Sequence, residues 1–161
     1  MDWILGELPL HPLLVHLTVV VIPVAAATVA LASVWPAARR RMGLLPAILA
    51  LLALIAVPIT SSAGNWLAER VGRTPLVDRH EALGNSMLPW TIALFLVAVA
   101  LWVWNRVATP TGRLRLIGSA VLAAAAVIIA VGSVITIVQI GESGASAVWT
   151  GNFSKDPIPT Q

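Results

Sequence analysis

Three histidines, His11, His16 and His80, are the residues of this chain with the most versatile chemistry. Two of them bound the stretch "HPLLVH" at the start of a long apolar run, and the third lies in "DRHEALGN". Imidazole nitrogens ligate metal ions and haem iron, and they exchange protons near neutral pH. The chain has no cysteine, which excludes disulfides, thiolate metal sites, iron–sulfur clusters and covalently attached c-type haem.

Helical spacing places His80 on a defined face. His80, Gly84, Met87 and Thr91 recur at intervals of four, three and four residues, so they line one side of a helix. A tetrapyrrole ring needs an axial imidazole with a flat space beside it, and a glycine one turn away leaves such a space. These residues therefore predict a b-type haem site.

The histidines of "HPLLVH" are not expected to form a local chelate, because five helical residues turn their directions about 140° apart unless His11 lies outside the helix and folds back. We expect His16 to pair with His80 across the helices, with His11 as a supporting residue or alternative ligand. Haem propionates would then reach arginines of the same end. Those arginines are Arg70, Arg73 and Arg79.

Two alternatives stay open for the same residues. A single copper or zinc ion could instead be held by His11, His16, His80 and Glu142. The site could also hold no cofactor, since glycines are the ordinary means of close helix packing in membranes and a histidine can simply lie at the interface.

The elements that position these residues are predicted to be membrane-spanning helices. The 161-residue chain is 58% hydrophobic and 11% charged, with a mean hydropathy of +0.91, which is unlike a soluble domain. Four stretches without charge are long enough to cross a hydrocarbon core of about 30 Å. The spans are predicted at about 12–35, 43–67, 82–105 and 115–141. Thr74-Pro75 is a helix-start signature ahead of the third apolar run.

Charge predicts the orientation of these spans. The first and third connections carry arginines and no acid, so they should be cytoplasmic. All seven acidic residues fall in the termini or the second connection. The prediction is an all-α integral membrane protein, a four-helix up-down transmembrane bundle over residues 1–150. It lies in the inner (plasma) membrane with both termini extracytoplasmic, and residues 151–161 form an irregular tail outside. No cleavable signal is expected, because the first ten residues lack Lys and Arg.

Three motifs carry a family resemblance: "HPLLVH", "DRHEALGN" and "GESGASAVW", in that order. With them, most of the chain resembles the predicted membrane proteins grouped as domain of unknown function 2231. The resemblance implies a small four-helix membrane domain and a role near electron transfer, since some members are joined to Rieske-type or cytochrome c modules. It marks His11, Pro12, His16, His80, Gly84, Gly144, Ala145 and Trp149. Many relatives carry a histidine where this chain has Glu142, which puts a fourth-helix ligand in doubt here.

Two functions follow, from different classes. The first is a membrane-embedded b-type haem (or metal) protein that carries electrons at the extracytoplasmic face, and the second is a cofactor-free accessory or scaffold subunit. Solute transport is weaker, because the polar residues stop halfway across the bilayer, and nothing supports hydrolase or transferase chemistry. Expected partners are the lipid bilayer and a redox protein, a larger membrane complex or a second copy. The basic pI, near 11.1, reports membrane orientation, so nucleic acid is excluded.

Overall fold

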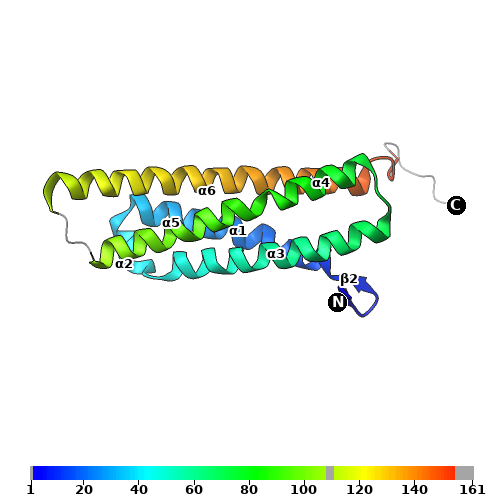
Figure 1. Ribbon diagram of the computed structural model, residues 1–161, viewed down its shortest axis with the longest axis horizontal. Helices are drawn as coiled ribbons and strands as arrows, with labels where there is room; N and C mark the ends of the chain where they lie inside the picture. Colours follow the sequence, from blue (N-terminus) through cyan, green and yellow to red (C-terminus); the bar gives the residue numbers. More distant parts are fainter. Residues whose placement is uncertain (1, 108–110, 155–161) are drawn as a thin grey trace.

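The computed structural model describes residues 2–107 and 111–154, which form a bundle of long helices (Figure 1). The long helices are α1 (Leu10–Val34), α3 (Leu45–Val71), α5 (Met87–Val107) and α6 (Gly112–Trp149), and the shorter ones are α2 (Pro36–Met42) and α4 (Pro75–Asn85). Four segments are long and apolar enough to span a membrane: Leu10–Val34, Leu45–Val71, Pro75–Arg106 and Gly112–Trp149. The prediction of an all-helical protein with four candidate spans is therefore confirmed.

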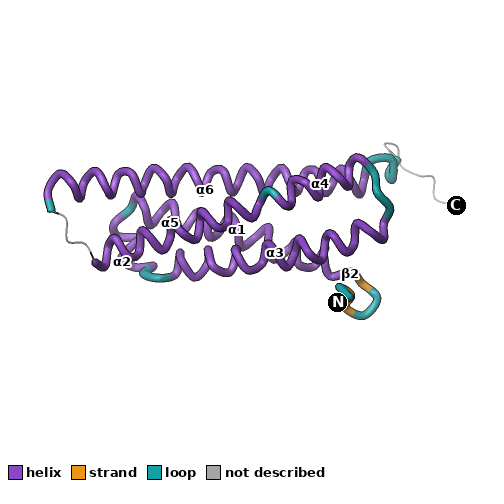
Figure 2. Tube along the Cα trace, viewed as in Figure 1, coloured by secondary structure: helices purple, strands orange, loops and turns teal. Residues whose placement is uncertain are grey.

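The third segment consists of two helices, α4 and α5, which meet at Ser86; Figure 2 shows the break as a short interruption of the helical trace. Pro89 lacks an N–H, so the carbonyl of Asn85 loses its helical donor at this point. The predicted start of the segment is confirmed, because Thr74 Oγ1 accepts a hydrogen bond from the Val77 N–H at 3.3 Å.

Two features depart from the predicted spans. The chain opens with an antiparallel hairpin of β1 (Ile4–Leu5) and β2 (Leu8–Pro9), whose two-residue turn has Gly6 at a φ of +63°. Helix α6 continues two turns beyond the predicted residue 141, to Trp149. Its 38 residues measure about 57 Å at 1.5 Å per residue, well beyond a hydrocarbon core of about 30 Å. Residues 155–161 of the predicted tail lie outside the described residues.

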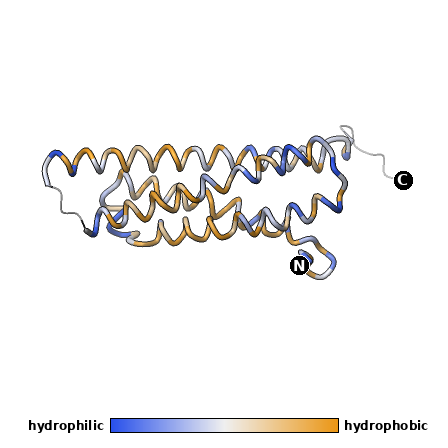
Figure 3. Tube along the Cα trace, in the orientation of Figure 1, coloured by the Kyte–Doolittle hydropathy of each residue, from blue (hydrophilic) through white to orange (hydrophobic). Residues whose placement is uncertain are grey.

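The four long helices pack in a ring in which α1 and α5 each contact both α3 and α6, while α4 lies against α6. One end of the bundle holds the hairpin, the α3–α4 connection and the end of α6; the other holds α2 and the start of α6 (Figure 1). Hydropathy separates an apolar middle from polar ends (Figure 3). Alanines and a few large side chains fill the core, among them Ile22, Val29 and Leu94, each fully buried.

Helix α6 carries three glycines against which rings of the preceding helices pack. Trp104 lies against Gly118, Trp90 against Gly132 and His80 against Gly144. At each glycine a Cβ would collide with the ring, so the absence of a side chain lets the ring reach the helix backbone. We call these three places the ring notches of α6.

Candidate functional site

His11 and His80 meet at the hairpin end of the bundle. His11 belongs to the first turn of α1 and His80 to the middle of α4. Their ring centroids are 6.1 Å apart and the ring planes are inclined by 74°, an edge-to-face contact. Both side chains are partly buried. The structure thus brings together two imidazoles that lie 69 positions apart in the chain.

The tautomer of His11 follows from its hydrogen bond. His11 Nδ1 lies 3.0 Å from the main-chain carbonyl oxygen of Thr60 on α3, and because a carbonyl only accepts, Nδ1 carries the hydrogen. In the neutral ring Nε2 then keeps its lone pair. The Thr60 hydroxyl lies 2.8 Å from the hydroxyl of Thr18, so the same residue of α3 holds α1 at two points.

His80 is held in the same way on the opposite side. Its Nδ1 lies 3.1 Å from the carbonyl oxygen of Ile140 and 3.0 Å from Ser143 Oγ, both on α6. The Ser143 hydroxyl itself donates to the Ile140 carbonyl at 2.8 Å, so its oxygen is free to accept from Nδ1–H. His80 is therefore also an Nδ1–H tautomer with an Nε2 lone pair.

A glycine lies against each ring. A Cβ at Gly64 on α3 would lie 2.8 Å from His11 Cε1, and a Cβ at Gly144 on α6 would lie 2.9 Å from His80 Cε1. Both distances are shorter than real Cβ contacts, so neither ring could keep its position beside an alanine. The two imidazoles are therefore fixed by a carbonyl at Nδ1 and by a flat glycine surface.

His16 is not part of this pair. Its side chain is exposed, and Nδ1 lies 2.6 Å from the carbonyl oxygen of Pro12 in its own helix. The predicted angle of about 140° between His11 and His16 has this consequence: with His11 turned into the bundle, His16 turns out of it. The structure pairs His80 with His11, and not with His16 as the sequence led us to expect.

Glu142 also lies apart from the histidines. It lines an open groove of about 420 Å³ between α4 and α6 with Arg79, Gln139 and Ser143, but of the two neighbours on α6 only Ser143 hydrogen-bonds to His80. One residue turns a helix by about 100°, which accounts for the difference. Within residues 2–107 and 111–154, no three His, Cys, Asp or Glu residues form a cluster suited to a metal ion. The copper or zinc site therefore stays a prediction.

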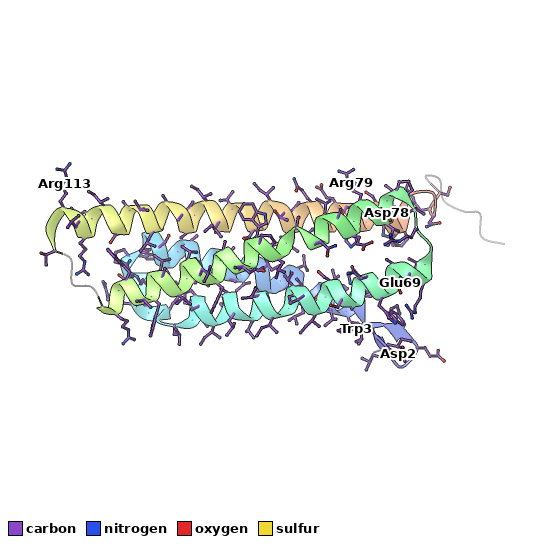
Figure 4. All side chains as sticks on the ribbon, viewed as in Figure 1. Asp2, Trp3, Glu69, Asp78, Arg79 and Arg113 are labelled. Carbon is purple, nitrogen blue, oxygen red and sulfur yellow. The ribbon has the colours of Figure 1, made fainter. Side chains whose placement is uncertain are left out.

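The predicted arginines have other surroundings. Arg79 is exposed, and in Figure 4 its side chain extends away from the bundle. The guanidinium of Arg70 stacks on the Trp66 ring at 3.8 Å from the centroid, and that of Arg73 lies 2.6 Å from a carboxylate oxygen of Glu81. None of the three is turned toward the histidine pair by a hydrogen bond that the structure shows.

The predicted stripe below His80 faces the interior. Met87 is 2% exposed and Thr91 is fully buried. Gly84 differs from the glycines beside the rings, because a Cβ built there meets no atom within 4 Å. Packing within the chain does not require a glycine at this position, and its missing side chain leaves open space one turn from His80.

Thr60, Gly64 and Ser143 complete the site. The sequence places all three at the same end as the histidines, but their spacing does not indicate that they contact the rings. One sequence pattern could have located these residues, a hydroxyl residue with a glycine close by on the same helix. It occurs as Thr60 with Gly64 and as Ser143 with Gly144. Such pairs place a hydrogen-bonding residue and a flat surface close together, which suits an inserted ring.

The family model described as predicted membrane protein (DUF2231) matches residues 7–157, which include both histidines and their partners. No curated protein and no solved structure matches the chain.

Proposed function

The chain belongs to the DUF2231 family of predicted membrane proteins, and from that premise we propose that it binds a b-type haem between His11 and His80 and carries electrons across its extracytoplasmic face. The observation that carries the proposal is the pair of imidazoles at 6.1 Å, each with Nδ1 on a carbonyl and with Nε2 in no hydrogen bond among the described residues.

The donor set fits haem iron better than an isolated ion. His11 and His80 would hold the iron of such a haem, which would supply one-electron transfer. Structural zinc takes four protein ligands and catalytic zinc three, whereas only two histidines meet here. The two imidazoles would hold such an iron through Nε2, the ring nitrogen that the carbonyl bonds leave free. A carbonyl bond at the second ring nitrogen is the usual way in which a ligating histidine is oriented.

Space beside the ligand supports the same choice. The missing side chain of Gly84 leaves open space one helical turn from His80, and Met87, three residues further along, is buried. A flat macrocycle could use this space beside the helix backbone. The propionates of such a haem would point to the polar end of the bundle. Arg79 lies at the polar end that carries the histidines, and it takes part in none of the three ion pairs found among the described residues.

The orientation proposed for the protein is an up-down bundle in the inner (plasma) membrane, with both termini and the histidine pair outside. Support comes from the charges: Glu69, Asp78 and Glu81 lie at the histidine end. The opposite end, at α2 and the start of α6, carries arginines without acids. An excess of arginine marks the cytoplasmic side of a membrane protein.

An absorption spectrum tests the haem proposal. Protein purified from haem-replete cells should show a Soret band that shifts on reduction with dithionite. His11→Ala and His80→Ala should remove that band, while His16→Ala, in which an exposed histidine is lost, should keep it. A colourless preparation that contains stoichiometric copper or zinc would replace haem by a single ion. A colourless and metal-free preparation would refute any cofactor at this site.

One observation favours a second function, a cofactor-free accessory or scaffold subunit of a membrane complex. Both Nδ1 atoms bond to the backbone of a neighbouring helix, so the histidines join α1 to α3 and α4 to α6 without any ligand. In that case His11→Ala and His80→Ala lower stability or assembly with a partner and leave the absorption spectrum unchanged.

A further inference from the structure

A second groove, of about 400 Å³, lies at the end of the bundle opposite the histidine pair. It is bounded by α2, the start of α3, the last turns of α5 and the start of α6. Its walls include the buried apolar residues Ala47, Ala98 and Leu101. Four arginines also line it: Arg39, Arg40, Arg106 and Arg115. The groove therefore combines an apolar floor with a strongly cationic rim.

Among the described residues, the four arginines have no acidic partner. The three ion pairs found in the described parts of the chain all lie at the histidine end. The sequence contains no Asp or Glu in residues 8–68 or 82–141, the segments that build this end. Like charges gathered in one groove repel, and an anion among them relieves the repulsion and accepts charge-assisted hydrogen bonds from guanidinium groups.

Trp102 provides an independent indication of a ligand. It lines the groove, and its indole N–H is buried without an acceptor anywhere in residues 2–107 or 111–154. The Arg106 guanidinium lies over its ring, 5.6 Å from the centroid. A buried donor without an acceptor is costly, so an oxygen from outside the chain would stabilise this arrangement.

We infer that this groove is a binding site for the phosphate headgroup of an anionic phospholipid. A phosphodiester supplies the negative charge for the arginines, and its oxygens can accept from guanidinium and indole N–H groups. The apolar walls and the exposed apolar side chains beside them, such as Leu45 and Ile48, suit acyl chains better than a free ion. Basic pockets between transmembrane helices are known to hold lipid headgroups. A role in setting the orientation of the protein in the membrane would explain neither why the arginines converge on one groove nor why the buried Trp102 N–H has no acceptor among the described residues.

Paired double variants test the site. Arg39→Gln/Arg115→Gln removes two groove arginines, and Arg41→Gln/Arg113→Gln is the matched control. The control loses the same net charge from the same two helices, but neither residue lines the groove. In Figure 4 the Arg113 side chain extends away from the bundle. Native mass spectrometry in neutral detergent measures binding of phosphatidylglycerol, phosphatidylcholine and inorganic phosphate to each protein, and thermal unfolding without lipid checks that each variant folds.

The unmodified protein should bind phosphatidylglycerol at least tenfold more tightly than phosphatidylcholine. The groove variant should lose at least tenfold in that affinity, while the control variant stays within about twofold. Equal losses in the two variants would overturn the site, because general charge attraction would then account for binding. Equal affinity for the two lipids would overturn it as well. Saturable binding of inorganic phosphate without a preference for phosphatidylglycerol would overturn the lipid assignment.

Discussion

Replacing Gly144 by alanine tests whether His80 is fixed against α6. The added Cβ would lie 2.9 Å from His80 Cε1 and 3.2 Å from Nδ1, so the ring must recede by about half an ångström or more to reach an ordinary contact. The ring cannot recede freely, because its Nδ1 is bonded to Ile140 and Ser143 at 3.1 and 3.0 Å. Movement away from α6 stretches both hydrogen bonds.

Two opposing effects set the magnitude. Overpacking lowers the free energy of unfolding by about 1–3 kcal/mol, and the weakened hydrogen bond accounts for about 0.5–1.5 kcal/mol of that loss. Alanine is the better helix former by up to about 1 kcal/mol. Gly141 on the same helix is the matched control, since a Cβ there meets nothing within 4 Å and only the helix-forming gain remains. The difference in unfolding free energy between the two variants should therefore be about 2 kcal/mol.

Thermal unfolding in one detergent, followed by circular dichroism, measures this difference. At about 2–4 °C per kcal/mol for a chain of this size, Gly144→Ala should melt roughly 4–8 °C below Gly141→Ala. Equal melting temperatures would show that His80 moves at no cost, and the ring could not then be a fixed ligand. A higher melting temperature for Gly144→Ala would refute the packing that the structure shows at this notch.

Three other variants have expected outcomes in the same unfolding assay. Gly132→Ala should cost about 3 kcal/mol, since the new Cβ collides with the Trp90 ring, which is far bulkier than an imidazole. Thr18→Val should cost about 1 kcal/mol by breaking the buried hydroxyl bond to Thr60, and an unchanged melting temperature would contradict that bond. Thr74→Ala should cost about 1 kcal/mol through loss of the helix cap, with faster amide hydrogen exchange confined to the first turn of α4.

The spans and the His80 face could be predicted from sequence because they depend on local pattern. A long stretch without charged residues identifies a membrane-spanning helix, and a Thr-Pro pair identifies the start of such a helix. Intervals of three and four residues identify a face without any knowledge of neighbours. The hairpin was missed because two-residue strands are too short to show alternation, leaving Gly6 as the one local signal.

For a different reason, the sequence pattern did not indicate that His11, rather than His16, lies beside His80. Helix α1 is apolar on every side, so hydrophobic periodicity does not say which side enters the bundle. Small and polar residues do indicate it: Thr18, Ala25 and Ala32 follow at intervals of seven residues and are buried. His11 lies seven residues before Thr18, on that same side, and His16 does not.

The ring notches of α6 have a mechanical consequence for the whole protein. A slip of one helical turn would move His80 from Gly144 onto Ile140 or Val148, and Trp90 from Gly132 onto Ile128 or Thr136, where no flat surface exists. The helices therefore cannot slide past one another in small steps. Between Arg115 and Ser143 the unbroken α6 spans about 42 Å. In bilayers of different thickness we therefore expect the bundle to tilt as one body or to deform the bilayer around it, so that the histidine pair and the arginine groove keep a constant separation.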